Sequence, residues 1–95
     1  MYDKILKKIR EKVRNGLYII SRHAQEELVD ENFSFEDLER SVYGGTIVRK
    51  QFDQLKRARY TISGEVLDGR CLRVVCRFSS DGDKIVIITC YEYEE

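Results

Sequence analysis

The chain has 95 residues, with 17 basic and 17 acidic side chains and a formal net charge of zero. A chain of this length builds one small core, so residues 1–95 are expected to form a single domain without a deep cofactor-binding unit. An apolar content of 42% and a charged content of 36% are typical of a soluble globular protein and argue against disorder. No apolar run approaches the length of a membrane span, and the first residues lack the hydrophobic run of a signal peptide. We therefore expect a cytoplasmic protein without membrane contact.

Charge is segregated along the chain although it sums to zero. Residues 4–14 carry six basic side chains and one acid, residues 25–39 carry seven acids and no base, and residues 49–59 carry five bases and one acid. The tail after Tyr91 adds three glutamates. This segregation predicts a bipolar surface, which can offer one side to an anion and another to a basic partner.

The three cysteines, Cys71, Cys76 and Cys90, all fall in segments with strand character. Their spacing matches no zinc motif, because no C-x-x-C pair is present and the only histidine is distant in sequence. We expect half-buried free thiols in a reducing compartment, with neither a metal nor a cofactor.

The start of the chain shows helical periodicity. Apolar residues from Tyr2 to Val13 recur every three or four positions, which predicts an amphipathic helix within residues 1–16. Asn15-Gly16 provides its stop. Its basic residues are expected to form a solvated face, and contact with an RNA backbone or a partner is the alternative.

Two further helices are predicted before residue 46. Ser21 is expected to cap the first of them, and residues 34–37 resemble a capping box that opens the second. In that second helix Phe35, Leu38 and Val42 are expected to face the core.

From Thr46 onward the apolar period changes to two, which predicts β-strands separated by turns such as Asp68-Gly69. The expected strands cover residues 46–52, 59–66, 71–78 and 84–92, and a short β-prone run over residues 17–20 precedes the second helix. The order of elements predicts an α+β fold, with N-terminal helices packed on one face of a twisted antiparallel β-meander formed by residues 46–92.

Alternation within these strands separates a core face from a face that carries arginines. Arg73 and Arg77 share one face of their strand, about 13 Å apart, and Arg59 of the preceding strand can lie beside them. Guanidinium groups bind phosphate through paired hydrogen bonds, and three of them on one face repel one another unless an anion lies among them. The alternative is that Glu65 or Asp68 pairs with the arginines and leaves a solvated surface.

Two other residue types are candidates for proton transfer. His23 is the only histidine and lies near the first turn of a predicted helix, where the helix dipole favours the neutral base. A capping or packing role is the alternative for His23. Tyr91 and Tyr93 share a face of the last predicted strand, where a tyrosine can stack on a base or donate a proton. The alternative is that they cover the edge of a small core.

Five segments of the sequence resemble a bacterial family of unknown function. They are Ile20-Ser21-Arg22-His23-Ala24, Gly45-Thr46-Ile47-Val48, Arg59-Tyr60, Gly69-Arg70-Cys71-Leu72-Arg73-Val74-Val75 and Ile87-Ile88-Thr89-Cys90-Tyr91. Members of this family resemble the RelE/BrnT-like ribonuclease toxins, and many are paired with a zinc-finger antitoxin of the YgiT type. The resemblance extends from about residue 17 to residue 93.

The resemblance implies a RelE-like fold with RNA at the open face of the sheet, and a type II toxin that cleaves mRNA without a metal. By residue type it assigns phosphate binding to Arg59, Arg73 and Arg77, and proton transfer to His23 or Tyr91. The implied partners are a cognate antitoxin, of the zinc-finger type in many members, and mRNA, free or on the ribosome. Whether the protein forms a homodimer is left open.

Two features of the sequence favour other functions on the same fold. The acidic tail after Tyr91 departs from the toxin pattern, because it would repel RNA beside the site. The balanced charge is unusual for a protein that binds RNA tightly and favours a non-catalytic protein- or RNA-binding module. An inactive member of the family is the third hypothesis.

Overall fold

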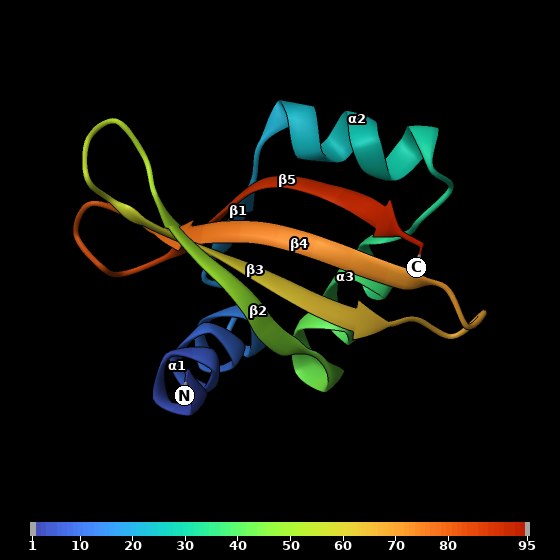
Figure 1. The fold of residues 1–95 in the computed structure, drawn as a ribbon, viewed down its shortest axis with the longest axis horizontal. Helices are drawn as coiled ribbons and strands as arrows, with labels where there is room; N and C mark the ends of the chain where they lie inside the picture. The colour runs from blue at the N-terminus through green and yellow to red at the C-terminus, as the bar shows by residue number, and fades with distance from the viewer. Residues whose placement is uncertain (1, 95) are drawn as a thin grey trace.

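The computed structural model describes residues 2–94 and has three helices and five strands in the predicted order (Figure 1). The helices are α1 (Asp3–Arg14), α2 (Arg22–Asp30) and α3 (Phe35–Gly44). The strands are β1 (Tyr18–Ile20), β2 (Thr46–Phe52), β3 (Ala58–Glu65), β4 (Cys71–Phe78) and β5 (Ile85–Tyr93). The predicted α+β class is confirmed.

The five strands form one open, mixed sheet in the order β1-β5-β4-β3-β2. Strands β2 to β5 pair antiparallel to their neighbours, as the meander predicts. The expected sheet was incomplete, because β1 adds a parallel edge strand beside β5. Alternation of side chains identifies a strand but does not identify its partner, and this pairing joins residues 67 positions apart, such as Ile20 and Ile87.

The helices lie against one face of this sheet. Helix α3 packs on β3 and β4, α1 packs on α3, and α2 runs along β5 (Figure 1). Ile9, Leu38, Ile62, Val74 and Ile87 are fully buried between these layers. No helix of residues 2–94 lies over the opposite face (Figure 1), so the sheet presents that face to solvent.

The start of α2 is tied to the edge of the sheet. Ser21 Oγ accepts a hydrogen bond from the backbone N–H of Ala24 (3.0 Å) and donates one to the carbonyl of Ile88 (2.7 Å). Ile88 is the extra residue of a β-bulge. Cys76 pairs with Ile87 and Val75 pairs with Thr89, so Ile88 has no partner on β4. The predicted cap is confirmed, and it also fixes where α2 meets β5.

The predicted capping box of α3 is confirmed, but the expected position of Phe35 is wrong. Ser34 and Asp37 exchange side-chain and backbone hydrogen bonds of 3.0 and 2.9 Å. Phe35 is the first residue of the helix and is 57% exposed. Phe33, which precedes the cap, is buried instead in the same core as Leu38. This is the arrangement of a hydrophobic staple, in which the residue just before the N-cap packs against the residue four positions after the N-cap.

Two glycines allow α3 to lie directly on β3. A Cβ atom added to Gly64 or Gly45 would overlap severely with the carbonyl oxygen of Ser41, well inside van der Waals contact. Ser41 is itself fully buried and donates from Oγ to the carbonyl of Leu38 (2.7 Å). The helix backbone therefore rests on strand backbone at this crossing, which only a residue without a side chain permits.

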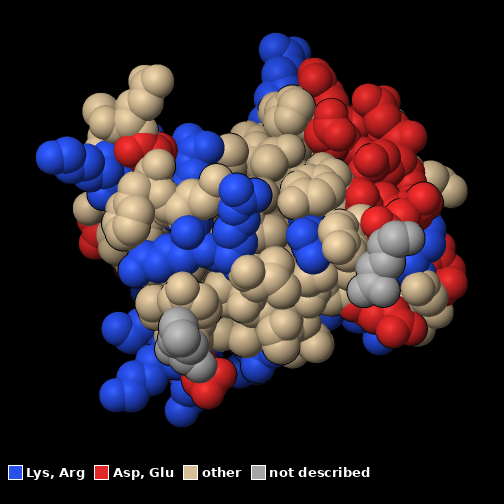
Figure 2. Space-filling view, in the orientation of Figure 1, with Lys and Arg blue, Asp and Glu red and all other residues tan. Residues whose placement is uncertain are grey.

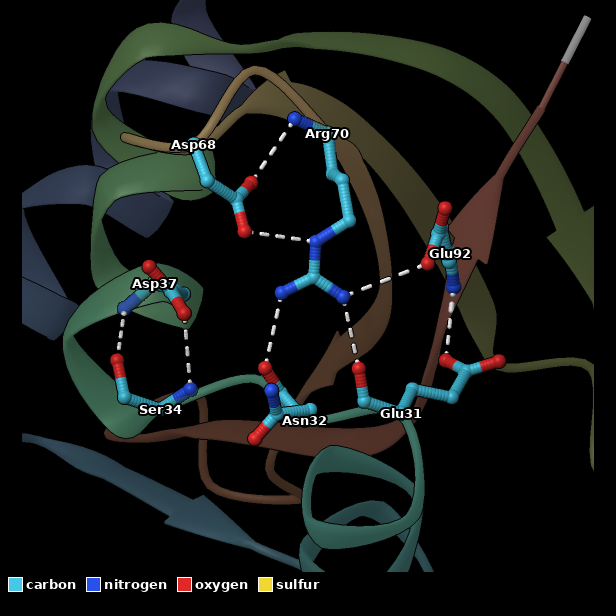
Figure 3. Close-up of polar contacts among 7 residues, drawn as sticks. All are labelled: Glu31, Asn32, Ser34, Asp37, Asp68, Arg70 and Glu92. Atoms are coloured by element: carbon cyan, nitrogen blue, oxygen red, sulfur yellow. Dashed lines mark hydrogen bonds and ion pairs between the residues drawn. The ribbon is translucent and has the colours of Figure 1, made fainter.

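Arg70 joins the β3–β4 turn to the loop between α2 and α3 (Figure 3). Its guanidinium group donates hydrogen bonds to Asp68 Oδ2 (2.8 Å), the carbonyls of Glu31 (2.8 Å) and Asn32 (2.9 Å), and Glu92 Oε1 (3.4 Å). The group also stacks on the Phe33 ring, with 3.9 Å between Cζ and the ring centroid. The donors of this arginine are occupied by the protein itself, so we assign it a structural role.

No helix within residues 2–94 combines the length and apolar character needed to cross a membrane.

We expect Gly64→Ala to lower the free energy of unfolding by about 1–3 kcal/mol, because the new methyl group meets backbone that cannot rotate away. Urea denaturation followed by circular dichroism measures the change. Gly44→Ala is the matched control, because Gly44 ends α3 with open space around its Cα. It should leave stability unchanged or raise it by up to about 1 kcal/mol. Equal effects of the two substitutions would contradict the close approach of α3 to β3.

We expect Arg70→Lys to lower the denaturation midpoint, because an ammonium group keeps the charge but cannot reproduce the fork that reaches the turn, the loop and β5 together. Arg22→Lys is the control, because the Arg22 side chain is 94% exposed on α2. A midpoint that is the same in both variants would show that the turn and the loop hold together without the guanidinium group.

Candidate functional site

The register of the sheet brings the predicted arginines together on its uncovered face. Arg73 pairs with Ser63 of β3 on one side and with Tyr91 of β5 on the other. Tyr60 pairs with Cys76, so the next residues outward, Arg59 and Arg77, continue the same antiparallel register side by side.

We call this uncovered surface the arginine face. It consists of the outward-pointing side chains of β2 to β5, among them Arg49, Arg59, Thr61, Ser63, Arg73, Val75, Arg77, Thr89, Tyr91 and Tyr93. Figure 2 shows Lys and Arg gathered across this side of the molecule, while Asp and Glu gather over α2. The bipolar surface that the sequence predicts is therefore present in three dimensions.

Arg49 joins the arginine face through a β-bulge. Ile47 pairs with Ile62 on the core side, but Arg49 pairs with Thr61 because Val48 is inserted without a partner. Simple alternation from Ile47 would place Arg49 on the core side, and the bulge at Val48 turns it to the outer face beside Thr61. Arg49 was not predicted as a site residue, because alternation alone assigns it to the other face.

Arg73 is held flat against an aromatic ring. Its Cζ lies 3.4 Å from the centroid of the Tyr93 ring, which fixes the plane of the guanidinium group. Its Nε is fully buried and has no hydrogen-bond acceptor among residues 2–94. A buried donor without an acceptor costs about 1–3 kcal/mol, so Arg73 is not stabilised by protein atoms alone.

Arg59 shares this property. Its Nε is also buried without a hydrogen-bond acceptor among residues 2–94, and the nearest acid, Asp53, places Oδ2 at 3.9 Å. That carboxylate is already occupied, because it accepts hydrogen bonds from the backbone N–H groups of Leu55 (2.9 Å) and Arg57 (2.9 Å) and from Arg57 Nε (2.7 Å). Asp53 therefore gives Arg59 only a distant countercharge.

The Asp53 carboxyl organises the β2–β3 loop. The hydrogen bond from the Arg57 backbone N–H is the main cause of a lowered pKa for Asp53, and the Arg57 side chain and the Leu55 backbone N–H lower it further. Desolvation acts in the opposite direction and is outweighed. The charged form is thus the one that the folded loop stabilises.

The acids expected as alternative partners do not neutralise the arginine face. Asp68 bonds to Arg70 instead, and Arg77 donates from Nη1 to the neighbouring carbonyl of Phe78 (3.1 Å). Within residues 2–94 neither Arg73 nor Arg77 forms an ion pair, and Glu65 forms none. The guanidinium groups are therefore available to an external anion.

His23 and Tyr91 lie in different surroundings. Tyr91 is half-buried on the arginine face opposite Arg73. His23 lies on α2 with 64% of its side chain exposed, and its Nε2 is 4.0 Å from Glu27 Oε1. Ser21, and not His23, caps the helix. The structure brings Arg59, Arg73, Arg77 and Tyr91 together on the sheet and leaves His23 on the neighbouring helix.

Two of the three thiols, those of Cys76 and Cys90, are poor nucleophiles. Burial raises the pKa of Cys76 to about 12 and that of Cys90 to about 11, where Glu31 and Glu27 add to the effect. Cys71 lies on the arginine side with its Sγ 3.1 Å from Ser63 Oγ. All three are free, and no group of three or more potential ligand residues within residues 2–94 is arranged to hold a metal ion.

These features define an α+β protein with an uncovered, arginine-bearing sheet face. The chain belongs to the family described as "Domain of unknown function (DUF4258)", whose match covers residues 20–92 and leaves α1 outside. The expected membership of a family of unknown function is confirmed by this match. Comparisons with curated proteins and with solved structures give no match.

Acid is expected to loosen the β2–β3 loop. Because the folded state lowers the pKa of Asp53, the stability that its charge contributes is present above the unfolded value near 3.9 and is lost as the pH falls through the lower folded value. Asp53→Asn should remove part of the decline in denaturation midpoint between about pH 5 and pH 2. The exposed Asp30→Asn is the control, and an identical pH profile in both variants would contradict the role of Asp53.

Proposed function

We propose that the arginine face binds RNA, and that the protein is a metal-independent endoribonuclease of the toxin–antitoxin kind that acts on mRNA. The observation that carries this proposal is that the buried Nε groups of Arg59 and Arg73 have no hydrogen-bond acceptor among residues 2–94, on a face that no helix of these residues covers. A phosphate that draws either guanidinium group outward supplies the missing acceptor and binds two of its N–H groups at once.

The composition of the face suits a sugar–phosphate chain better than a single small anion. Four arginines are spread over three adjacent strands, and the hydroxyl groups of Ser63 and Tyr91 lie among them. Cations contact phosphates without regard to sequence, and hydroxyl groups can hydrogen-bond to the 2′-OH that distinguishes RNA from DNA.

Cleavage on this face proceeds by attack of the 2′-oxygen on the adjacent phosphorus. A base accepts the 2′-OH proton, the P–O5′ bond breaks, and an acid donates a proton to the leaving 5′-oxygen, which leaves a 2′,3′-cyclic phosphate and a 5′-OH. Arg73 and its neighbours stabilise the added negative charge of the pentacoordinate phosphate. Tyr91, which pairs with Arg73 across the strands, is the first candidate for proton transfer at the phosphate, and His23 on α2 is the other candidate.

The likeness to RelE/BrnT-like toxins supports the same proposal. The residues that carry it include His23, Arg59, Arg73 and Tyr91, and the family match covers them all. A toxin of this kind requires a cognate antitoxin, of the zinc-finger type by the resemblance. The acidic residues over α2 give such a partner a surface of opposite charge to the arginine face (Figure 2).

A non-catalytic RNA- or protein-binding module is the second candidate. The exposure of His23 on α2 favours it, because no imidazole lies on the sheet among the arginines to take up the 2′-OH proton. The same RNA affinity without any cleavage would distinguish this candidate from the enzyme.

Purified protein is expected to cut single-stranded RNA in the presence of EDTA and to release 2′,3′-cyclic phosphate ends. Arg73→Ala should abolish cleavage and weaken RNA binding at least about tenfold, because a charge-assisted phosphate contact is lost. It should also reduce the slope of log affinity against log salt by roughly 0.7.

Arg22→Ala is the matched control. It also removes one positive charge, but from a side chain of α2 that is 94% exposed and lies outside the arginine face. It should retain both activities. RNA that stays intact with wild-type protein, together with normal growth on expression, would rule out the enzyme. If neither variant loses RNA affinity, the arginine face is ruled out as the binding surface.

A further inference from the structure

The loop between β2 and β3 forms a shallow hollow that the proposed function does not use. It projects from the sheet as the yellow-green loop at the left of Figure 1. Its lining consists of Phe52, Asp53, Gln54, Leu55, Arg57 and Arg59. Arg59 belongs to the hollow and to the arginine face, so the two sites adjoin.

The hollow has a fixed shape because one carboxylate organises its floor. The Asp53 side chain is only 6% exposed and accepts from Leu55, from the Arg57 backbone and from the Arg57 guanidinium group. Backbone hydrogen bonds from Asp53 to the Arg57 carbonyl (3.0 Å) and from Lys56 to the Asp53 carbonyl (2.9 Å) close the turn. A preorganised loop loses little entropy when a ligand binds.

The rim of the hollow exposes apolar side chains that the core does not need. Phe52 is 66% exposed and Leu55 is 71% exposed. Lys50 places its ammonium 5.3 Å from the centroid of the Phe52 ring, which occupies one side of the ring. Phe52 pairs with Ala58 of β3, so its ring lies on the same side of the edge strand β2 as Lys50 and on the opposite side from Arg59. A flat apolar group can stack on the ring surface that Lys50 leaves exposed.

The charge around the hollow selects the kind of ligand. Arg57 and Arg59 line it, and Lys50 lies at the Phe52 ring. Asp53 is the only acid in the lining, and its carboxylate already accepts hydrogen bonds from Leu55 and Arg57 of the loop. An aromatic platform beside cations fits a group that joins a flat ring to a negative charge. A nucleotide of a single strand has this structure, with the base for the ring and the phosphate for the cations.

We propose that this hollow is a base-binding subsite for single-stranded RNA, in which the strand passes around the edge strand β2, so that Phe52 stacks on one base while Arg59, on the other side of the hairpin, holds the phosphate of a neighbouring nucleotide on the arginine face. This inference rests on the proposed function, because it takes the same RNA as ligand. It adds a position at which one base of the strand is held by stacking. Gln54 also lines the hollow, and a side-chain amide can hydrogen-bond with the edge of a base.

The test compares Phe52 variants in binding to a fluorescein-labelled single-stranded RNA of about ten nucleotides, followed by anisotropy, a length that spans one groove-sized site. Phe52→Ala and Phe52→Leu should each weaken binding by about tenfold, the effect of losing one base–aromatic stack, whereas Phe52→Tyr should bind as the wild type does. Phe52→Leu separates stacking from simple apolar contact. Leu67→Ala is the control, because Leu67 is 74% exposed in the β3–β4 turn.

Two further measurements separate this subsite from the arginine face. Phe52→Ala should leave the salt slope unchanged, since no phosphate contact is lost, while Arg73→Ala should reduce it. The second measurement uses a set of RNAs, each with an abasic residue at one position. At one position the abasic RNA should bind the wild type more weakly than the intact RNA does, whereas Phe52→Ala should bind the two RNAs equally.

The outcomes distinguish the two proposals. If the wild type binds no RNA, the proposed function fails and this subsite fails with it. If the wild type binds RNA and Arg73→Ala weakens it while Phe52→Ala matches Leu67→Ala, the arginine face stands and the subsite is overturned. Loss of binding to a co-expressed protein in Phe52→Ala, with RNA affinity intact, would assign the hollow to a protein partner and also overturn it.

Discussion

The register between β3, β4 and β5 is the constraint on which the rest of the molecule depends. It places Val74 in the core and Arg73 outside, and it aligns Arg73 with Ser63 and Tyr91. A shift of one residue in any of these pairings would bury guanidinium groups and expose the apolar face to water. The core and the arginine face are therefore two consequences of one alignment.

Local sequence patterns were sufficient for most of the elements. Strands Thr46–Phe52 and Cys71–Phe78 have the predicted bounds, and the caps at Ser21 and Ser34 are as predicted. These features depend on alternation or on hydrogen bonds between neighbours in sequence, and both are visible in the chain. The placement of Arg73 and Arg77 on one face followed from the same alternation.

The features that sequence reasoning missed depend on long-range geometry. Phe35 and Phe33 are both aromatic residues next to a helix cap, and only the packing of the staple decides which one is buried. The bulge at Val48 and the parallel pairing of β1 leave no distinct local signal. The stack of Arg73 on Tyr93 joins two strands, although the shared face of Tyr91 and Tyr93 was a hint.

The arginines of this domain fall into two physical classes. The guanidinium group of Arg70 donates hydrogen bonds to four acceptors of the protein itself, and these bonds stabilise the fold. Arg59 and Arg73 retain buried donors without acceptors among residues 2–94. Residue type and sequence motif do not separate these classes, because Arg70 and Arg73 lie three positions apart in one segment of the sequence. Only the surrounding atoms do.

The position of β5 between β1 and β4 has a consequence for the order in which the domain is made. This strand is the last of the sheet in chain order, yet it contributes Ile85, Ile87 and Cys90 to the core and Tyr91 to the arginine face. A chain growing on the ribosome therefore leaves β1 without a neighbour, and β4 paired with β3 alone, until β5 emerges. Closure of the core and completion of the arginine face then occur in the same late step, so a partly synthesised chain has neither.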